Sequence, residues 1–360
     1  MVQLQSNNPE TSGRAVLDQL SIDTPPMEAR AADVLPGGPG WQFEPKWDGF
    51  RCLAHRSGGE IDLRAKSGKP LARYFPEVAA LLRSLSSDRF VLDGELVVPV
   101  GEELSFDALQ MRLHPAESRV RKLSVETPAE FILFDMLVDM KGVALTSEPL
   151  LTRRAALEIF WNHLQDKTGL RLSPFTRSRD EARNWLDHAG GALDGVVAKR
   201  LDGAYLAGER AMLKVKHLQT ADCVVGGFRY AQGKREVGSL LLGLYDDAGL
   251  LHHVGFTSGF ADFDRAVLTR QLESMIQPPG FTGRAPGGPS RWSTERSGEF
   301  QPLRPSLVAE VRYDHVTGNR FRHGTKFMRW RPDKAPVQCR FDQLGKPLSP
   351  GELAVLLTKV

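Results

Sequence analysis

Residues 44–51 read Glu-Pro-Lys-Trp-Asp-Gly-Phe-Arg. Lys46 lies two residues after Glu44 and two residues before Asp48. A lysine ammonium is inert as a nucleophile until it loses its proton, and electropositive neighbours or a metal-bound substrate lower its pKa. Gly49 allows a tight turn or the close approach of a ligand. Taken alone, the octapeptide fits a surface turn as well as it fits a nucleophilic lysine.

The composition is that of an ordinary globular protein. With 360 residues, two domains of common size are favoured over one large domain, and 41% hydrophobic and 25% charged residues are typical values. No apolar run approaches the roughly 20 residues of a membrane span. Three widely spaced cysteines predict neither a disulfide framework nor a zinc site. Residues 1–14 are polar without a signal-peptide pattern, so we expect a cytoplasmic protein with no membrane partner.

The charge is divided unevenly along the chain. Residues 216–360 contain 20 Lys and Arg against 14 Asp and Glu, whereas residues 1–215 contain 27 against 30. The C-terminal part is therefore the better candidate to face a polyanion. Arginine outnumbers lysine in this part, which favours bidentate phosphate contacts.

The N-terminal part is predicted to mix strands with helices. Apolar or alternating runs predict strands at residues 41–44, 50–54, 61–65, 90–98, 131–137, 194–200 and 212–216. Helical spacing predicts helices after Pro76 and over residues 152–165 and 179–189. Phe134, within one of the strands, could stack on a flat ligand, although packing in the core is the favoured alternative for a lone aromatic residue.

Several of these strands carry charges that an apolar strand does not normally hold. Asp93-Gly94-Glu95 interrupts one of them, and two buried carboxylates are costly unless they are paired or bind a cation. A bulge or hairpin explains the Asp-Gly pair equally well. Lys214 and Lys216 are two residues apart and so share one face of their strand. Because like charges repel, that face is expected either to bind an anion or to lie in solvent.

The character of the chain changes near residue 217. Short apolar runs separated by turn residues occupy residues 224–228, 240–245, 250–256 and 307–313, with one helical stretch at 261–275, which predicts a small β-barrel. Residues 278–289 are rich in Gly and Pro and are predicted to form a surface loop. Residues 318–331 contain several arginines and a lysine but no acid.

The ordered set Lys46-x-Asp-Gly, Asp93-Gly-Glu95, Phe134, Asp194-Gly-Val-Val-Ala-Lys199, Lys214-x-Lys216 and Arg331-x-Asp333-Lys334 resembles the covalent nucleotidyltransferases. This superfamily comprises ATP-dependent DNA ligases, RNA ligases and mRNA capping enzymes. The flanking sequence resembles bacterial DNA ligases, and the length resembles the short actinobacterial DNA ligase C group. The resemblance covers roughly residues 20–340. Six motifs in the family's order and spacing are very specific, although the first alone would be weak.

The resemblance implies an α+β fold with two domains. We expect a polar N-terminal extension at residues 1–20, an adenylation domain with mainly antiparallel sheets and flanking helices at 21–216, and an oligonucleotide-binding (OB) barrel at 217–360. The implied reaction passes AMP from ATP to Lys46, then to a 5′-phosphate at a DNA nick, and is completed when the 3′-hydroxyl attacks. A phosphoramidate nitrogen protonates readily and becomes a good leaving group for the second transfer.

The resemblance also implies roles for individual residues. The expected nucleotide-binding residues are Glu44 at the adenine edge, Phe134 against the ring, Arg51 and Lys66 at the ribose or phosphates, and Lys199, Lys214 and Lys216 at the α-phosphate. Glu95 and Asp194 are expected to organise Mg²⁺ or Mn²⁺, or the ribose. Arg331, Asp333 and Lys334 are expected to orient the pyrophosphate leaving group. Arg320, Arg322 and Arg329 are expected to contact DNA phosphates, with Arg284, Arg291 and Arg296 as further candidates.

Two positions depart from the family pattern. Ala65-Lys66-Ser67-Gly68 stands where ligases usually have Ser-Arg-Asn-Gly, so Lys66 keeps the charge without the bidentate fork of arginine. Asp194 stands where the family usually has Glu, and its shorter side chain favours a water-mediated contact to the metal.

Two competing interpretations remain at this stage. One is an RNA ligase or a GTP-dependent capping enzyme, which labelling with ATP or GTP would distinguish. The other is a non-catalytic nucleic-acid-binding protein on a ligase scaffold, against which the intact Lys46, Glu95, Lys214 and Lys216 argue. The expected partners are nicked duplex DNA and DNA-repair proteins, the expected state is a monomer, and the expected location is the nucleoid.

Overall fold

The computed structural model describes residues 20–101, 103–189, 192–259, 264–287, 298–345 and 348–358. Two compact units divide the chain. The first comprises Met1–Lys216 together with Pro347–Val360, and the second comprises His217–Lys346. Among the described residues no helix is long and apolar enough to cross a bilayer.

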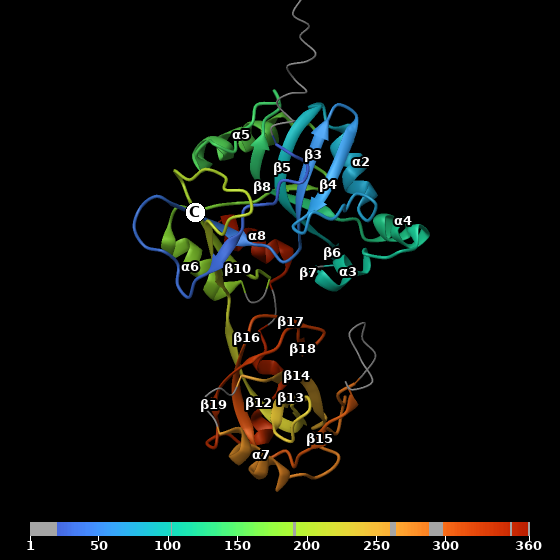
Figure 1. Ribbon diagram of the computed structural model, residues 1–360, viewed down its shortest axis with the longest axis vertical. Helices are drawn as coiled ribbons and strands as arrows, with labels where there is room; N and C mark the ends of the chain where they lie inside the picture. Colours follow the sequence, from blue (N-terminus) through green and yellow to red (C-terminus); the bar gives the residue numbers. More distant parts are fainter. Residues whose placement is uncertain are drawn as a thin grey trace, which may run out of the picture. The chain divides into compact units, whose positions relative to one another are not determined.

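The larger sheet of the first unit has five strands in the order β4-β3-β5-β8-β9 (Figure 1). They are β3 (Phe50–Ser57), β4 (Glu60–Ala65), β5 (Arg89–Val97), β8 (Glu130–Val138) and β9 (Leu170–Leu172). Neighbouring strands are antiparallel except β8 and β9. β5 pairs with β3 without interruption but shifts register against β8 between Asp93 and Gly94. The Asp-Gly pair therefore marks a bulge and not a hairpin.

The second sheet of this unit has four strands in the order β1-β11-β10-β2. They are β1 (Ala29–Ala31), β2 (Trp41–Lys46), β10 (Gly195–Arg200) and β11 (Met212–Lys216). Its register sets the positions of the lysines. Gly195 of β10 lies opposite both Lys46 and Lys216, and Val197 lies opposite both Glu44 and Lys214. Because side chains alternate along a strand, these two rows share one face of the sheet.

Helices cover the outer face of the larger sheet and flank the smaller one. They are α2 (Pro76–Ser84), α3 (Phe106–Met111), α4 (Glu117–Glu126), α5 (Leu150–His163) and α6 (Arg179–His188). Val78 and Leu82 of α2 pack with Leu157 and Phe160 of α5 in one apolar cluster against the five-stranded sheet. A two-stranded hairpin of β6 (Pro99–Val100) and β7 (Glu103–Leu104) leads into α3.

Two glycines are required where backbones approach closely. A Cβ on Gly49 would lie 2.3 Å from the carbonyl oxygen of Leu96, so the turn after Lys46 can pack on β5 only without a side chain. A Cβ on Gly195 would lie 2.1 Å from the carbonyl oxygen of Val215, and this glycine has φ of +139°. Both glycines therefore let the strands that carry Lys46 and Lys216 come together with their neighbours.

The second unit is built on a six-stranded antiparallel sheet. Its main path is β14-β13-β12-β16-β19, and β15 pairs with β12. The strands are β12 (Gln219–Tyr230), β13 (Val237–Tyr245), β14 (Leu251–Thr257), β15 (Gln301–Pro302), β16 (Val308–Tyr313) and β19 (Lys326–Trp330). β17 (Val316–Thr317) and β18 (Arg320–Phe321) form a separate hairpin. α7 (Arg265–Glu273) contributes Leu268 and Leu272 to the core of the unit.

The predicted elements are found within a few residues of their expected bounds, but the last segment differs. Residues 217–360 were expected to form one domain, whereas Pro347–Val360 groups with the first unit. The reason is that Leu353 and Leu357 of α8 (Pro350–Thr358) are buried in a cluster with Trp185 of α6. β1, β9, α3 and α4 were not predicted; the first two have only three residues each, and the helices bury few apolar side chains.

Candidate active site

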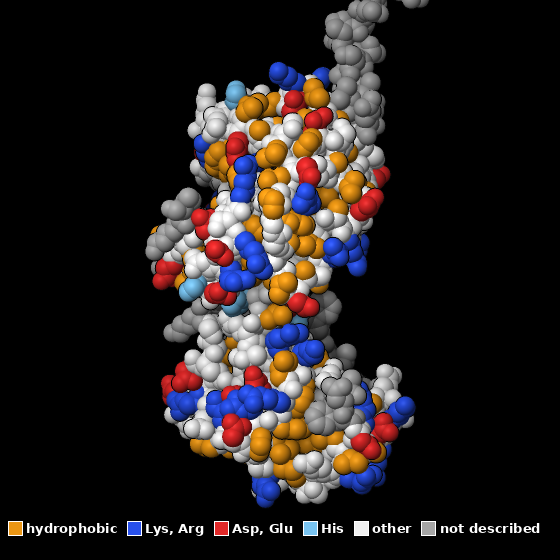
Figure 2. All heavy atoms as spheres, turned by 90° about the vertical axis from the view of Figure 1, so that its left-hand side faces the viewer, with side chains coloured by type: hydrophobic (Ala, Val, Ile, Leu, Met, Phe, Trp, Pro, Cys, Tyr) orange, Lys and Arg blue, Asp and Glu red, His pale blue; other side chains and the backbone are white. Residues whose placement is uncertain are grey.

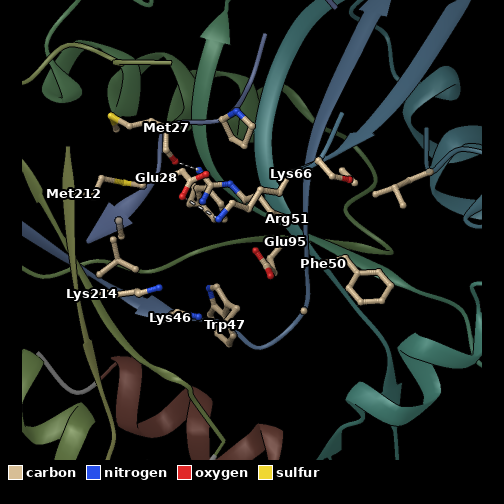
Figure 3. Close-up of a pocket in the computed structure, with 18 of the residues that line it drawn as sticks. Met27, Glu28, Lys46, Trp47, Phe50, Arg51, Lys66, Glu95, Met212 and Lys214 are labelled. Atoms are coloured by element: carbon tan, nitrogen blue, oxygen red, sulfur yellow. Dashed lines mark hydrogen bonds and ion pairs between the residues drawn. The ribbon is translucent and has the colours of Figure 1, made fainter. Parts of the chain in front are cut away.

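A cavity of about 790 Å³ opens in the first unit and is lined by residues from both of its sheets. This volume lies within the range of small-molecule sites. Its lining contains most of the residues expected to bind a nucleotide, namely Glu44, Lys46, Arg51, Lys66, Glu95, Phe134, Lys199 and Lys214. Figure 3 shows Lys46 and Lys214 extending into it from one side and the Glu95 carboxylate pointing into it.

Lys46 is held at the end of β2 by Asp194. The Lys46 Nζ lies 2.5 Å from one carboxylate oxygen of Asp194, and Lys216 Nζ lies 3.3 Å from the other. The backbone N–H of Asp194 also donates to the carbonyl oxygen of Lys46 at 2.9 Å. Asp194 therefore bridges two lysines. Neither Asp194 nor Lys216 lines the cavity, but Asp194 pairs with Lys46, which does, and Lys216 pairs with Asp194.

Lys214 lines the cavity without a carboxylate partner among the described residues. It forms no ion pair with any residue that the structure describes, and burial together with the charges of Lys46, Lys216 and Lys66 lowers its pKa. A lysine that is partly buried among other cations is a favourable place for an anion. Of the two interpretations for this strand face, the cavity favours anion binding over plain solvation.

Glu44 and Lys199 form a buried pair at one end of the cavity. Lys199 Nζ lies 2.7 Å from one Glu44 oxygen, and the Gln42 side-chain amide donates to the other at 2.8 Å. Lys199 Nζ also lies 4.9 Å from the centre of the Phe134 ring. Phe134 is 7% exposed and lines the cavity, so it serves the core and the site at once.

Arg51 is fixed by a buried carboxylate behind the cavity. Its Nε and Nη2 donate to the two oxygens of Asp93 at 2.5 and 2.6 Å, and its guanidinium carbon lies 4.5 Å from the centre of the Phe134 ring. Tyr205 donates its hydroxyl to Asp93 at 2.7 Å and accepts from the backbone N–H of Met27 at 3.0 Å. Burial opposes the charge of Arg51, but the charge and hydrogen bonds of Asp93 outweigh it and raise the pKa of the guanidinium.

Glu95 has the most perturbed carboxylate of the cavity. Burial raises its pKa to about 7, and Arg51 and Lys46 offset only part of this effect. No three metal-ligating side chains come together in the described part of the chain. Mg²⁺ commonly uses one or two carboxylates with substrate phosphates and water, so Glu95 fits such a site. Asp194 fits it less well in this state because both of its oxygens are paired with lysines.

Lys66 reaches the cavity from the turn after β4. Its Nζ lies 3.0 Å from Glu28, and this hydrogen bond lowers the pKa of Glu28. Lys66 remains 59% exposed in its side chain, so it lies at the mouth of the cavity and not in its interior.

The remaining expected site residues belong to the second unit. Arg331 and Lys334 both pair with Asp222, at 2.9 and 2.8 Å, and Arg331 also pairs with Asp333. Arg329 pairs with Glu310 at 2.7 Å. The other two expected DNA contacts, Arg320 and Arg322, lie at and just after β18, and Arg284 is also described; Arg291 and Arg296 lie outside the described residues.

Several residues of the site were not anticipated from the sequence. The contact of Gln42 with Glu44 could have been predicted, since Gln42 lies two residues before Glu44 on the same face of β2. Three other contacts could not have been predicted, because the partners come from distant segments of the chain. They are Tyr205 with Asp93, Glu28 with Lys66, and Asp222 with Arg331.

Comparison with known proteins identifies the family of the chain. The family described as ATP dependent DNA ligase domain matches residues 28–216, and the ATP dependent DNA ligase C terminal region matches residues 233–334. DNA ligase C2 of Mycolicibacterium smegmatis is 43% identical over 89% of this chain and 94% of that protein. The multifunctional non-homologous end joining DNA repair protein LigD of Mycobacterium tuberculosis is 32% identical over 83% of this chain but only 37% of that protein.

A solved Lig E DNA ligase is similar in fold, with a TM-score of 0.53 at 17% identity over 85% of this chain and 99% of that chain. The α+β architecture, with a nucleotidyltransferase unit followed by an OB-type unit, is therefore that of known ligases. The chain belongs to the ATP-dependent DNA ligase family.

Proposed function

We propose that this ligase seals nicks in duplex DNA through a lysyl-AMP on Lys46 and an adenylated DNA strand. The observation that carries the proposal is the position of Lys46, which projects into a nucleotide-sized cavity beside Lys214 while Asp194 holds its ammonium. The similarity to LigD supports a role in DNA repair. Nicked duplex is the proposed substrate, DNA-repair proteins the proposed partners, a monomer the proposed state and the nucleoid the proposed location.

In the first step the Lys46 amine attacks the α-phosphorus of ATP. The new bond joins Nζ to phosphorus, the bond from phosphorus to the bridging oxygen breaks, and pyrophosphate leaves with that electron pair. Asp194 is the nearest acceptor for the ammonium proton, at 2.5 Å. Lys214 and Lys216 neutralise the phosphate oxygens as charge develops on them, which is the dominant form of catalysis for phosphoryl-type transfers.

In the second and third steps AMP moves to DNA and then leaves. An oxygen of the 5′-phosphate attacks the same phosphorus, and the Lys46 nitrogen departs with a proton as the amine. The 3′-hydroxyl then attacks the DNA phosphate, and AMP leaves as the strands join. The same lysines serve all three steps, because in each step a nucleophile attacks a phosphorus atom that carries negatively charged oxygens.

The other residues of the cavity hold the nucleotide. Phe134 offers an aromatic ring to adenine, and Glu44 offers an acceptor to its edge. Lys199, expected at the α-phosphate, is proposed instead as a donor at the adenine edge, because its Nζ lies 2.7 Å from Glu44 and 4.9 Å from the centre of the Phe134 ring. Arg51 and Lys66 contact the ribose or the phosphates. Glu95, together with Asp194, would hold Mg²⁺ or Mn²⁺. When bound, the metal neutralises charge on the transferring phosphates.

The second unit supplies two sets of charged residues in this proposal. Arg331, Asp333 and Lys334 orient the pyrophosphate during the first step. Arg320, Arg322 and Arg329 contact DNA phosphates without reading bases, because a nick sealer needs affinity and not sequence preference. An Arg331→Ala variant that fails with ATP but seals pre-adenylated DNA normally would support the first role, and equal loss on both substrates would contradict it.

The proposal is tested by incubating the protein with α-labelled ATP and Mg²⁺ or Mn²⁺, followed by a denaturing gel. The expected result is covalent label that nicked duplex removes, with a sealed product. Label from GTP alone would instead indicate capping chemistry. Label that only nicked RNA removes would indicate an RNA ligase, and no label under any nucleotide would contradict the proposal.

A further inference from the structure

Asp222 joins two of the cations proposed to bind pyrophosphate. It lies in β12, and its two oxygens accept from Arg331 Nη1 at 2.9 and 3.0 Å. One of them also accepts from Lys334 Nζ at 2.8 Å. Asp222 lies outside every motif on which the family resemblance rests. A single carboxylate therefore fixes the distance between two cations that are separated by two residues in the chain.

The two carboxylates on Arg331 differ in how easily an anion could replace them. Asp333 accepts hydrogen bonds from Nε and Nη2 of the guanidinium, at 2.9 and 2.8 Å, and its side chain is 61% exposed. Asp222 accepts hydrogen bonds from Nη1, and its side chain is 11% exposed. An incoming phosphate would therefore meet the Nε–Nη2 edge of Arg331 while Asp222 keeps the other edge.

The backbone of Asp222 is itself held in place. Its N–H donates to the Gln343 side-chain oxygen at 2.8 Å, and its carbonyl oxygen accepts from the Gln343 amide at 3.0 Å. Asp222 is also opposite Glu310 in the β12–β16 ladder. Arg331 and Lys334 follow the end of β19, with their backbone N–H groups bonded to the carbonyl oxygens of Val308 and Arg331 at 2.8 and 3.2 Å, and they reach Asp222 through long side chains. The carboxylate is thus the fixed member of the group, and the two long side chains take their positions from it.

We propose that Asp222 is a positioning residue for lysine adenylation, which holds Arg331 and Lys334 at the spacing that the pyrophosphate end of ATP requires. Ordering two long cationic side chains costs conformational entropy. A rigid carboxylate that orders them before ATP binds removes this cost from the binding step. The inference rests on the proposed function. It adds a residue that does not touch the nucleotide but acts through two that do.

The test compares two reactions of Asp222→Asn, which removes the charge and keeps the shape. The rate of Lys46 adenylation from ATP should fall about 10- to 100-fold, the factor that corresponds to losing one hydrogen bond between charged groups. The sealing of pre-adenylated nicked DNA should stay within about 3-fold of wild type. Glu273→Gln breaks another carboxylate–arginine pair of the same unit, Glu273 with Arg235 at 3.0 Å, and should change neither rate. A similar fall of both rates in Asp222→Asn, or a faster adenylation, would overturn the inference.

A second measurement separates positioning from a general effect on folding. In an Arg331→Ala, Lys334→Ala background, adding Asp222→Asn should cause no further loss of adenylation, because the groups through which it acts are gone. A loss of the same factor in that background would overturn the inference. If wild type forms no lysyl-AMP, or if the double alanine variant adenylates normally, the proposed function fails first. If both behave as proposed and Asp222→Asn does not, only this inference fails.

Discussion

The two units of this ligase differ in how far carboxylates balance their positive charges. In the first unit, Lys46 and Lys216 share the single carboxylate Asp194, Lys214 pairs with no described carboxylate, and burial raises the pKa of Glu95 to about 7. In the second unit, three cations meet three carboxylates: Arg329, Arg331 and Lys334 against Asp222, Glu310 and Asp333. Figure 2 shows Lys and Arg side chains of this unit beside Asp and Glu side chains.

The difference indicates two kinds of anion site. The lysines of the cavity are a preformed site with unbalanced charge, so a phosphate gains their full attraction as it enters. The cations of the second unit are balanced, so an anion must replace a carboxylate and gains only the difference. Mutations in the first site should therefore be more damaging to adenylation than the loss of a balanced cation that has no proposed part in adenylation, such as Arg329.

The largest effect should come from Lys46→Arg. Arginine keeps the charge that faces Asp194 but does not lose its proton in proteins, so it cannot act as the nucleophile. Adenylation should fall at least ~1000-fold, measured with labelled ATP, while thermal unfolding shows an intact fold. Retention of more than a tenth of the wild-type rate would mean that charge and not nucleophilicity is the contribution of this position.

The next effect directly compares an unbalanced cation with a balanced one. Lys214→Met should slow adenylation about 100-fold, because the developing charge loses a donor inside a partly dry cavity. Arg329→Met, which removes a cation already paired with Glu310, should slow it less than about 3-fold. Equal losses in single-turnover assays would contradict the contrast between the two sites.

A smaller effect concerns the free energy of unfolding, which the burial of the charged Glu95 carboxylate reduces. The folded protein keeps the Glu95 proton up to about pH 7, whereas an ordinary glutamate loses it near pH 4.5. Since the folded state binds more protons in this range, this residue makes the free energy of unfolding decrease as the pH rises from about 4.5 to 7. Glu95→Gln should therefore be more stable than wild type by about 1–3 kcal/mol at pH 8, and by much less at pH 5.

Denaturant unfolding at the two pH values measures this effect, with the exposed Glu60→Gln as the control. A gain that is independent of pH would show that packing, and not the raised pKa of Glu95, is responsible. Loss of ATP-dependent activity in Glu95→Gln despite the gain in stability would support its proposed role at the metal.

The smallest effect should appear in the salt dependence of DNA binding. Arg320→Ala and Arg322→Ala should each reduce the slope of log affinity against log salt by about 1, equally on different sequences. Binding isotherms on two unrelated nicked duplexes at several salt concentrations measure this. A change that depends on sequence would instead indicate base contacts.

The sequence predicted the parts of the site that lie close together in the chain or repeat a strand period. Lys46 with Glu44, and Lys214 with Lys216, follow from spacing of two along β2 and β11. The pairing of Asp194 with Lys46 could not be predicted, because it depends on the register between β2 and β10. Tyr205 and Asp222 were missed for the same reason: their partners come from distant segments. α8 was misassigned because its apolar residues do not reveal which unit they pack against.

Peptide mapping by mass spectrometry after incubation with ATP and Mg²⁺ shows whether Lys46 is the residue that receives AMP. We expect one AMP per chain, attached to the peptide that contains Lys46, and its removal by pyrophosphate. AMP on a peptide that contains Lys214 or Lys216 would contradict the assignment of the nucleophile, because those lysines are placed to hold phosphate and not to attack it. No adduct under conditions in which the protein seals DNA would contradict the covalent mechanism itself.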